Sequence, residues 1–258
     1  MADVTRSGVR IHYEVEGDGL PLILHTGGGG DLEMWRTAGY PVGLSDRRII
    51  LMDHRGRGAS DKPRDTEEHR IDRYVGDVIA VADDLDLTSF DFFGYSAGAS
   101  IGYRLAATHP ERVKALIGLG AVGSEASVND DVERAAARVR THGSDELVRW
   151  LREDEPDLPE WFADQMRSTD PEMFALTIEA WSSWGGSWSE FASVRCPVLL
   201  IVGELEEPGA GENASRAAAR MGDGRAVVLP GLGHVAAFVR SDLVMPHVRG
   251  FLETASPT

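Results

Sequence analysis

Short apolar runs alternate with helical segments along most of this chain, and that alternation limits the possible folds more than any other feature. Strand character occurs at residues 9–16, 20–25, 48–53, 90–93, 113–119, 197–203 and 225–229. Helical patterns lie between these runs, at residues 72–85, 97–109, 212–221 and 243–253. Several runs are apolar without polar alternation, as expected of strands covered on both faces. The alternation predicts an α/β fold with parallel strands joined by crossover helices.

The region between residues 124 and 193 interrupts this alternation. It contains no clear strand, but it holds five of the six tryptophans, which are Trp150, Trp161, Trp181, Trp184 and Trp188. We interpret it as a helical cap inserted into a core formed by residues 1–123 and 194–258. The indoles can pack the cap onto the core, wall an apolar substrate pocket, or do both. Trp181 and Trp184 are our pocket candidates.

Charge and composition exclude several classes of function. The chain has 26 Lys and Arg against 42 Asp and Glu, a net charge of −16 that would repel nucleic acid and anionic membranes. We expect no signal peptide, and the apolar run at residues 115–123 is shorter than the roughly 20 residues of a membrane span. The single cysteine, Cys196, cannot form an intrachain disulfide and suits a reducing cytosol. We therefore expect a cytoplasmic protein with a small-molecule substrate, whose oligomeric state the sequence leaves open.

The pentapeptide Gly-Tyr-Ser-Ala-Gly at residues 94–98 lies between a strand and a helix that begins with small residues. A sharp strand-to-helix turn forces the central residue, Ser96, into a strained conformation and brings backbones close together. Glycines two positions before and after Ser96 remove side chains that would clash. The helix N-terminus then favours negative charge beside Ser96. Ser96 is our candidate nucleophile, and its neighbour Tyr95 is a pocket candidate.

A serine hydroxyl is a poor nucleophile unless a base takes its proton. Of the eight histidines, His234 is the best candidate, because it lies in a glycine-rich loop after the last strand. The base needs a carboxylate that holds its tautomer. Glu204, Glu206 and Glu207 directly follow the buried strand at residues 197–203, so one of them is the natural partner of His234.

The attack also needs donors for the developing oxyanion. Residues 22–25 form a buried strand that leads into four glycines at residues 27–30. Unhindered amides there can face the active serine together with the N–H of Ala97. A phosphate-binding loop is the rival interpretation, but no Lys-Ser or Lys-Thr follows at the spacing that such a loop requires.

Six motifs occur in an order that resembles the α/β-hydrolase superfamily over nearly the whole chain. They are His-Thr-Gly-Gly-Gly at 25–29, Met-Asp-His-Arg-Gly-Arg-Gly-Ala-Ser at 52–60, Gly-Tyr-Ser-Ala-Gly at 94–98, His-Pro-Glu-Arg-Val at 109–113, Pro-Val-Leu-Leu-Ile-Val-Gly at 197–203 and Gly-Leu-Gly-His at 231–234. The resemblance implies an eight-stranded, mostly parallel sheet flanked by helices, with a helical cap after strand six. It also implies nucleophile Ser96, base His234 and oxyanion amides from Gly27, Gly28 and Ala97.

The chain departs from that family at two positions. The triad acid is usually Asp, whereas the corresponding residue here is Glu206, an accepted variant. Glu204 and Glu207 stay as alternatives, and Glu125 is an outsider because some relatives supply the acid from just after strand six. Thr26 stands where a glycine usually follows the histidine. It can narrow the oxyanion loop or place a hydroxyl near the substrate.

These residues predict a serine hydrolase that cleaves a carboxylic ester or lactone of a small, partly apolar substrate through an acyl-enzyme. Acyl transfer, C–C bond hydrolysis and perhydrolysis would use the same triad, and a non-catalytic ligand receptor can share the fold. The Gly-x-Gly-x-x-Gly at residues 118–123 is a weak match to a dinucleotide site, because no second strand ending in an acid follows it. We expect no cofactor and no metal, since no ligand spacing such as His-Glu-x-x-His occurs.

Overall fold

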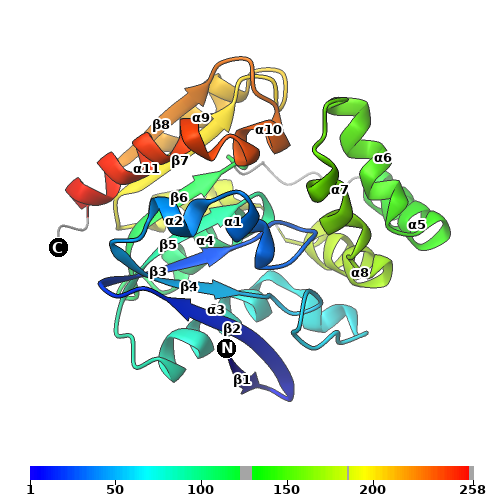
Figure 1. Ribbon diagram of the computed structural model, residues 1–258, viewed down its shortest axis with the longest axis horizontal. Coiled ribbons are helices and arrows are strands. Elements are labelled where there is room, and N and C mark those ends of the chain that lie inside the picture. The colour runs from blue at the N-terminus through cyan, green and yellow to red at the C-terminus, as the bar shows by residue number, and fades with distance from the viewer. Residues whose placement is uncertain (123–129, 185, 256–258) are drawn as a thin grey trace.

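The computed structural model describes residues 1–122, 130–184 and 186–255, and a single eight-stranded sheet forms its centre (Figure 1). The strands are β1 (Ala2–Arg6), β2 (Val9–Glu16), β3 (Leu20–His25), β4 (Arg47–Met52), β5 (Phe90–Tyr95), β6 (Val113–Leu119), β7 (Val198–Gly203) and β8 (Gly224–Leu229). Their order is β1-β2-β4-β3-β5-β6-β7-β8. The pairings of β2 with β1 and with β4 are antiparallel, and all the others are parallel. The expected eight-stranded, mostly parallel sheet is therefore confirmed.

The edge strand β1 is the strand that the apolar pattern did not indicate. Its five residues are Ala-Asp-Val-Thr-Arg, and only two of them are even half-buried. An edge strand has a neighbouring strand on one side only, and because most side chains of β1 are exposed, few of them need to be apolar. A weak hydrophobic pattern is the result, and such a strand cannot be distinguished from a loop by periodicity.

The register of the parallel strands brings the ends of β3, β5 and β6 to one edge of the sheet. His25 pairs with Gly94, and Gly94 pairs with Gly118. On the other side of β6, Gly203 at the end of β7 pairs with Leu229 at the end of β8. The loops that follow these strands therefore emerge together, at the edge where open α/β sheets form their sites.

Helices cover both faces of the sheet. One face packs against α3 (Ile71–Asp84), α4 (Ala97–Thr108) and α9 (Ala210–Ala218), and the other against α1 (Glu33–Thr37), α2 (Tyr40–Gly43), α10 (His234–Val239) and α11 (Ser241–Ala255). Successive residues of β7 point to opposite faces: Val198 and Leu200 join the first apolar cluster, whereas Leu199 and Ile201 join the second. This explains why the central strands lack polar alternation.

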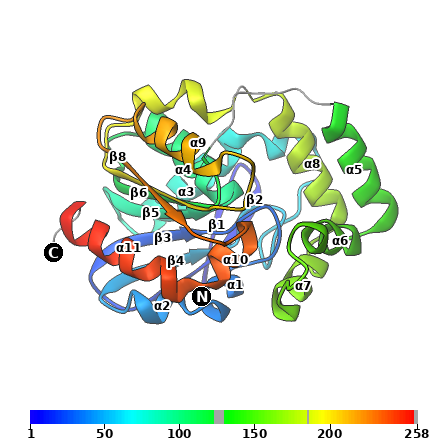
Figure 2. The ribbon, with the colours of Figure 1, turned by 90° about the horizontal axis from the view of Figure 1, so that it is seen from above.

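In the described part of the chain between β6 and β7, four helices form a layer of their own beyond the carboxyl ends of the strands. They are α5 (Asp130–His142), α6 (Asp145–Asp154), α7 (Glu160–Arg167) and α8 (Pro171–Ser182), and two short 3-10 turns follow them, η2 (Ser187–Ser189) and η3 (Phe191–Ser193). A further 3-10 turn, η1 (Thr66–His69), precedes α3. Figures 1 and 2 place α5 to α8 together at one end of the molecule. We call these four helices the helical layer.

Two further observations concern the helices. Pro246 lies in the second turn of α11, not in the first turn where its missing N–H would cost nothing. Within the described ranges, no helix is both long enough and apolar enough to cross a membrane.

Candidate active site

Ser96 occupies the turn between β5 and α4 in a backbone conformation that few residues adopt. Its φ of 54° and ψ of −119° lie outside the favoured regions for a residue with a side chain. The Ser96 N–H donates to the carbonyl of Leu119 on β6 at 2.7 Å, which holds the turn against the sheet. A Cβ on Gly94 would collide with the backbone of Gly98, and a Cβ on Gly98 would collide with the carbonyl of His25. The flanking glycines thus allow the close approach that the turn requires.

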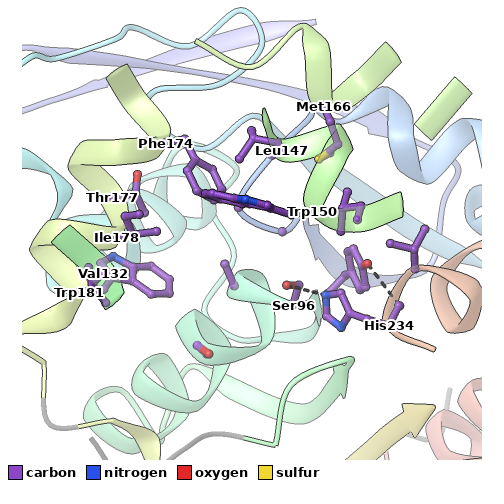
Figure 3. Close-up of a pocket in the computed structure, with 18 of the residues that line it drawn as sticks. Ser96, Val132, Leu147, Trp150, Met166, Phe174, Thr177, Ile178, Trp181 and His234 are labelled. Carbon is purple, nitrogen blue, oxygen red and sulfur yellow. Dashed lines mark hydrogen bonds between the residues drawn. The ribbon is translucent and has the colours of Figure 1, made fainter. Parts of the chain in front are cut away.

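His234 and Glu206 continue from Ser96 as a chain of hydrogen-bonded side chains. Ser96 Oγ lies 3.0 Å from Nε2 of His234 (Figure 3), and Nδ1 of His234 lies 3.3 Å from Oε2 of Glu206. In the tautomer with the proton on Nδ1, the imidazole donates to the carboxylate and accepts from the serine hydroxyl. The other oxygen of Glu206 accepts the N–H of Gly203 at 2.8 Å, so the carboxylate is fixed to the end of β7.

Two of the other candidate acids, Glu204 and Glu207, form hydrogen bonds elsewhere and not with His234. Glu204 accepts the N–H of Gly231 at 2.8 Å, and Glu207 accepts from the side-chain amide of Asn213 at 3.0 Å. Glu125 lies outside the described residues. The geometry therefore distinguishes Glu206 from its two sequence neighbours.

Tyr95 supports the imidazole from one side. Its ring stacks on that of His234, with centroids 5.1 Å apart, and on the ring of Phe238 at 4.3 Å. Burial raises the pKa of the Tyr95 hydroxyl well above its ordinary value. Because the phenol stays neutral, this contact holds the His234 ring by packing and adds no charge to the site.

The glycine loop after β3 lies against Ser96. A Cβ on Gly27 would be 3.1 Å from Cβ of Ser96, so a side chain there would press on the serine. The carbonyl of Gly27 accepts from Nε2 of His54 at 2.9 Å, and the carbonyl of Gly28 accepts from Nε of Arg57 at 2.8 Å. Contacts with the core thus fix the orientation of these two carbonyls. Within the described ranges, the amides of Gly27 and Ala97 donate no hydrogen bond to the protein and remain available to a substrate oxygen.

The groups that hold the glycine loop are deeply buried. Burial lowers the pKa of His25 to about 4 and that of His54 well below its usual range, so both are neutral at pH 7. Burial also lowers the pKa of Arg57 to about 10, which still leaves the guanidinium charged at neutral pH. Its hydrogen bonds go to the carbonyls of Gly28 and Gly56, and no carboxylate of the described chain is within ion-pair distance of it. A buried positive charge therefore lies directly behind the loop.

A cavity of about 510 Å³ lies above Ser96 and His234, between the core and the helical layer. The side of the cavity formed by the helical layer is largely apolar and aromatic, as Figure 3 shows for Leu147, Trp150, Met166, Phe174 and Ile178, and Thr177 and Ser182 add hydroxyl groups. Tyr95, Trp181 and Trp184 also line the cavity. Thr26 does not: it is 1% exposed and buried beneath the loop, so the expectation that it contributes to the pocket was wrong.

Several residues of the site had no clear signal in the sequence. Leu147 and Met166 lie in the largely polar helices α6 and α7, and Phe174 and Ile178 lie in α8, where many residues are apolar, so nothing in the sequence favoured these four. Helical periodicity predicts which side of a helix is apolar, but it does not predict which apolar residues line the pocket, because that depends on how α6 to α8 pack. Within the described ranges, no group of three or more His, Cys, Asp or Glu side chains is placed to hold a metal ion.

Comparisons with known proteins agree with this fold. The α/β-hydrolase-fold profile matches residues 21–141. The 2-hydroxymuconate semialdehyde hydrolase of Pseudomonas sp. (strain CF600) is 30% identical over 133 residues, which are 51% of this chain and 47% of that protein. The matches span between about a third and two thirds of the length of the curated relatives compared.

Solved structures match over nearly the full length. The enol-lactonase from Burkholderia xenovorans LB400 superposes with a TM-score of 0.83 at 25% identity, covering 97% of this chain and 99% of that one. A thermophilic esterase from Thermogutta terrifontis has a TM-score of 0.85 at 22% identity, with 99% of both chains covered, and shows likeness of fold alone. The eight-stranded, mostly parallel sheet, the profile match and the full-length structural match together show that the chain belongs to the α/β-hydrolase-fold superfamily.

Proposed function

We propose that the protein is a serine hydrolase that cleaves uncharged, largely apolar carboxylic esters or lactones. The observation that carries the proposal is the chain from Ser96 through His234 to Glu206, at 3.0 and 3.3 Å, which ends at the floor of the apolar cavity. Its volume of about 510 Å³ lies within the usual range for small-molecule sites, roughly 300–1,000 Å³.

The reaction begins when Oγ of Ser96 attacks the substrate carbonyl while Nε2 of His234 takes the hydroxyl proton. The carbonyl oxygen becomes an oxyanion that the amides of Gly27 and Ala97 bind, with Gly28 as a further donor. The tetrahedral intermediate collapses, the C–O bond to the alcohol breaks, and the imidazolium returns its proton to the leaving oxygen. Water then attacks the acyl-enzyme with His234 again as base, the bond between the acyl carbon and Oγ breaks, and the imidazolium returns its proton to Ser96. The products are a carboxylic acid and an alcohol, which a lactone keeps in one molecule.

The lining of the cavity supports an uncharged acyl group. Among the described residues that surround it, none is Asp, Glu, Lys or Arg. A substrate with a carboxylate in this cavity would lose its hydration without gaining a cation, which is costly. Esters and lactones without charge carry no such penalty. The enol-lactonase that shares this fold at 25% identity supports the same reaction class.

The test compares the wild type with Ser96→Ala on a panel of p-nitrophenyl esters of increasing acyl length and on simple lactones. We expect wild-type turnover of neutral substrates, and a loss in kcat of at least about 10⁴-fold in Ser96→Ala. An organophosphonate should label the wild type once per chain and leave Ser96→Ala unlabelled. A matched ester that carries a carboxylate in its acyl chain should be a poor substrate.

Two results would contradict the proposal. Absence of both turnover and labelling in the wild type would exclude an acyl-enzyme at Ser96. Labelling without hydrolysis of any ester or lactone would keep the nucleophile and assign the site to another reaction.

A further inference from the structure

A carboxylate from the helical layer is hydrogen-bonded to the backbone of the segment that carries His234. Glu155 follows α6 directly, and 80 residues separate it from Val235. Its Oε1 accepts the N–H of Val235 at 2.5 Å, and its Oε2 accepts the N–H of Ala236 at 2.7 Å. Both oxygens are thus used, on two successive amides immediately after the catalytic base.

These two amides belong to the first turn of α10, where helix N–H groups have no partner within the helix. The residue before the helix is Gly233, so α10 has no side chain of its own that can act as a cap. A carboxylate is a strong acceptor for such amides and is favoured at the positive end of the helix. Glu155 therefore supplies, from the helical layer, the cap that the core segment lacks.

The glycine at position 233 is explained by the same contact. Its φ of −87° and ψ of −170° are open to any residue, so the backbone conformation does not require glycine. A Cβ there would lie 2.7 Å from Cδ and 2.8 Å from Oε1 of Glu155. The absence of a side chain at Gly233 leaves space for the carboxylate of Glu155, and this explanation of the glycine supports the contact.

The helical layer also holds the loop on the opposite side of Ser96. The N–H of Gly30 donates to Oγ1 of Thr169 at 3.0 Å, and the N–H of Asp31 donates to Oε1 of Gln165 at 3.1 Å. Backbone on both sides of the nucleophile is therefore bonded to side chains of the layer. On the His234 side, Glu155 accepts both of these hydrogen bonds, from the N–H groups of Val235 and Ala236.

We propose that Glu155 is a positioning residue that makes the alignment of His234 depend on docking of the helical layer. The inference rests on the proposed function of Ser96. Because His234 is the first residue of α10, a shift of the two bonded amides moves the imidazole relative to Oγ of Ser96, now 3.0 Å away. Glu155 lines the second cavity beside His234 and not the apolar cavity in which we place the acyl group, so its loss should lower kcat and leave KM nearly unchanged.

The first experiment measures kcat per active site, titrated with an organophosphonate, in Glu155→Ala and in the control Glu153→Gln. Glu153 is exposed on the same turn of α6. A misplacement of about 1 Å typically costs about 10²-fold, so we expect a 10- to 100-fold lower kcat in Glu155→Ala with KM within about twofold. Glu153→Gln should match the wild type. Unchanged kcat in Glu155→Ala, or a loss confined to KM, would overturn the proposal.

A double-mutant cycle with Gly233→Ala tests the contact itself. In a chain that keeps Glu155, the new methyl group should displace the carboxylate and reproduce the loss seen in Glu155→Ala. In the Glu155→Ala background, the same methyl group should cost no more than about twofold. Additive losses would show that the two residues act separately, which contradicts the proposal.

Amide hydrogen exchange on the full chain gives a readout that does not depend on turnover. The amides of Val235 and Ala236 should exchange faster in Glu155→Ala, whereas those of β5 and β6 should keep their protection. If no ester or lactone is hydrolysed, the proposed function fails while this measurement still tests the contact. Unaltered exchange at Val235 and Ala236 would overturn the role of Glu155 whatever the substrate is.

Discussion

The core and the helical layer meet at Ser96, and they contribute opposite kinds of side chain. The core supplies polar groups held by buried contacts, as when Glu206 accepts the N–H of Gly203 or Arg57 donates to the carbonyl of Gly28. The layer contributes apolar side chains to the cavity, and its ion pairs, such as that of Arg140 with Glu172, are at its partly exposed surface. The difference assigns the reacting groups to the core and the choice of substrate to the layer. Glu155, Thr169 and Gln165 are exceptions, because their polar side chains accept hydrogen bonds from the backbone of the core.

The strongest test of this division of roles between core and layer is to remove the negative charge of Glu206 in the core. Glu206→Gln keeps the size of the side chain but cannot stabilise the imidazolium or enforce its tautomer. We expect kcat to fall by about 10³- to 10⁴-fold, with KM changed little, in steady-state assays of the best neutral ester. Glu207→Gln is the matched control, because its side chain is exposed, and it should stay within about twofold of the wild type. If Glu206→Gln keeps near-normal turnover while Glu204→Gln or Glu207→Gln loses it, the acid is assigned wrongly.

The next largest effect is expected at Arg57, the buried cation that is hydrogen-bonded to the glycine loop. Arg57→Met removes the donors that hold the carbonyl of Gly28 and lets the loop rotate its amides away from the oxyanion. Loss of one oxyanion donor costs about 10²- to 10³-fold elsewhere, so we expect about a 10²-fold lower kcat per titrated site. Phosphonate labelling should slow in parallel, since the phosphoryl oxygen occupies the same position. Ester turnover and labelling at wild-type rates would mean that the loop is oriented without Arg57.

The same division explains what the sequence could predict. Ser96, His234 and Glu206 follow the ends of β5, β8 and β7, so strand pattern and spacing suffice to place them at one sheet edge. The helical layer has no such rule, because the packing of α6 to α8 decides which of its apolar residues face the cavity. Glu155 has no local signal at all, since its partners lie 80 residues away. Thr26 was misplaced because a motif position tells nothing about side-chain direction.

Acidification should lower the free energy of unfolding through a buried histidine of the core and not through an exposed histidine of the layer. His25 is buried and neutral in the folded core with a pKa of about 4, whereas the unfolded chain titrates at about 6.5. Between these values the unfolded state binds more protons, so stability falls as pH falls. From pH 7 to 5, His25 should contribute a loss of about 2 kcal/mol in the free energy of unfolding.

Urea unfolding at pH 7 and 5 checks this. The loss between the two pH values should be about 2 kcal/mol smaller in His25→Gln than in the wild type. His142→Gln, which changes an exposed histidine of the layer, should show the wild-type difference. Equal pH sensitivity in His25→Gln and the wild type would mean that His25 is not held neutral.

The smallest effect should arise in the layer, where Ile178 faces the cavity from α8. Ile178→Ala enlarges the space available to the acyl chain, and a lost apolar contact of this size is worth about 10-fold in kcat/KM. We expect that loss for short esters and a smaller one for long esters, so that the preferred acyl length increases across the panel. Labelling by a small phosphonate should stay within about twofold, because the core is untouched. An equal loss for every chain length together with slower labelling would place the effect of Ile178 on the reacting groups, and the division between core and layer would then not hold.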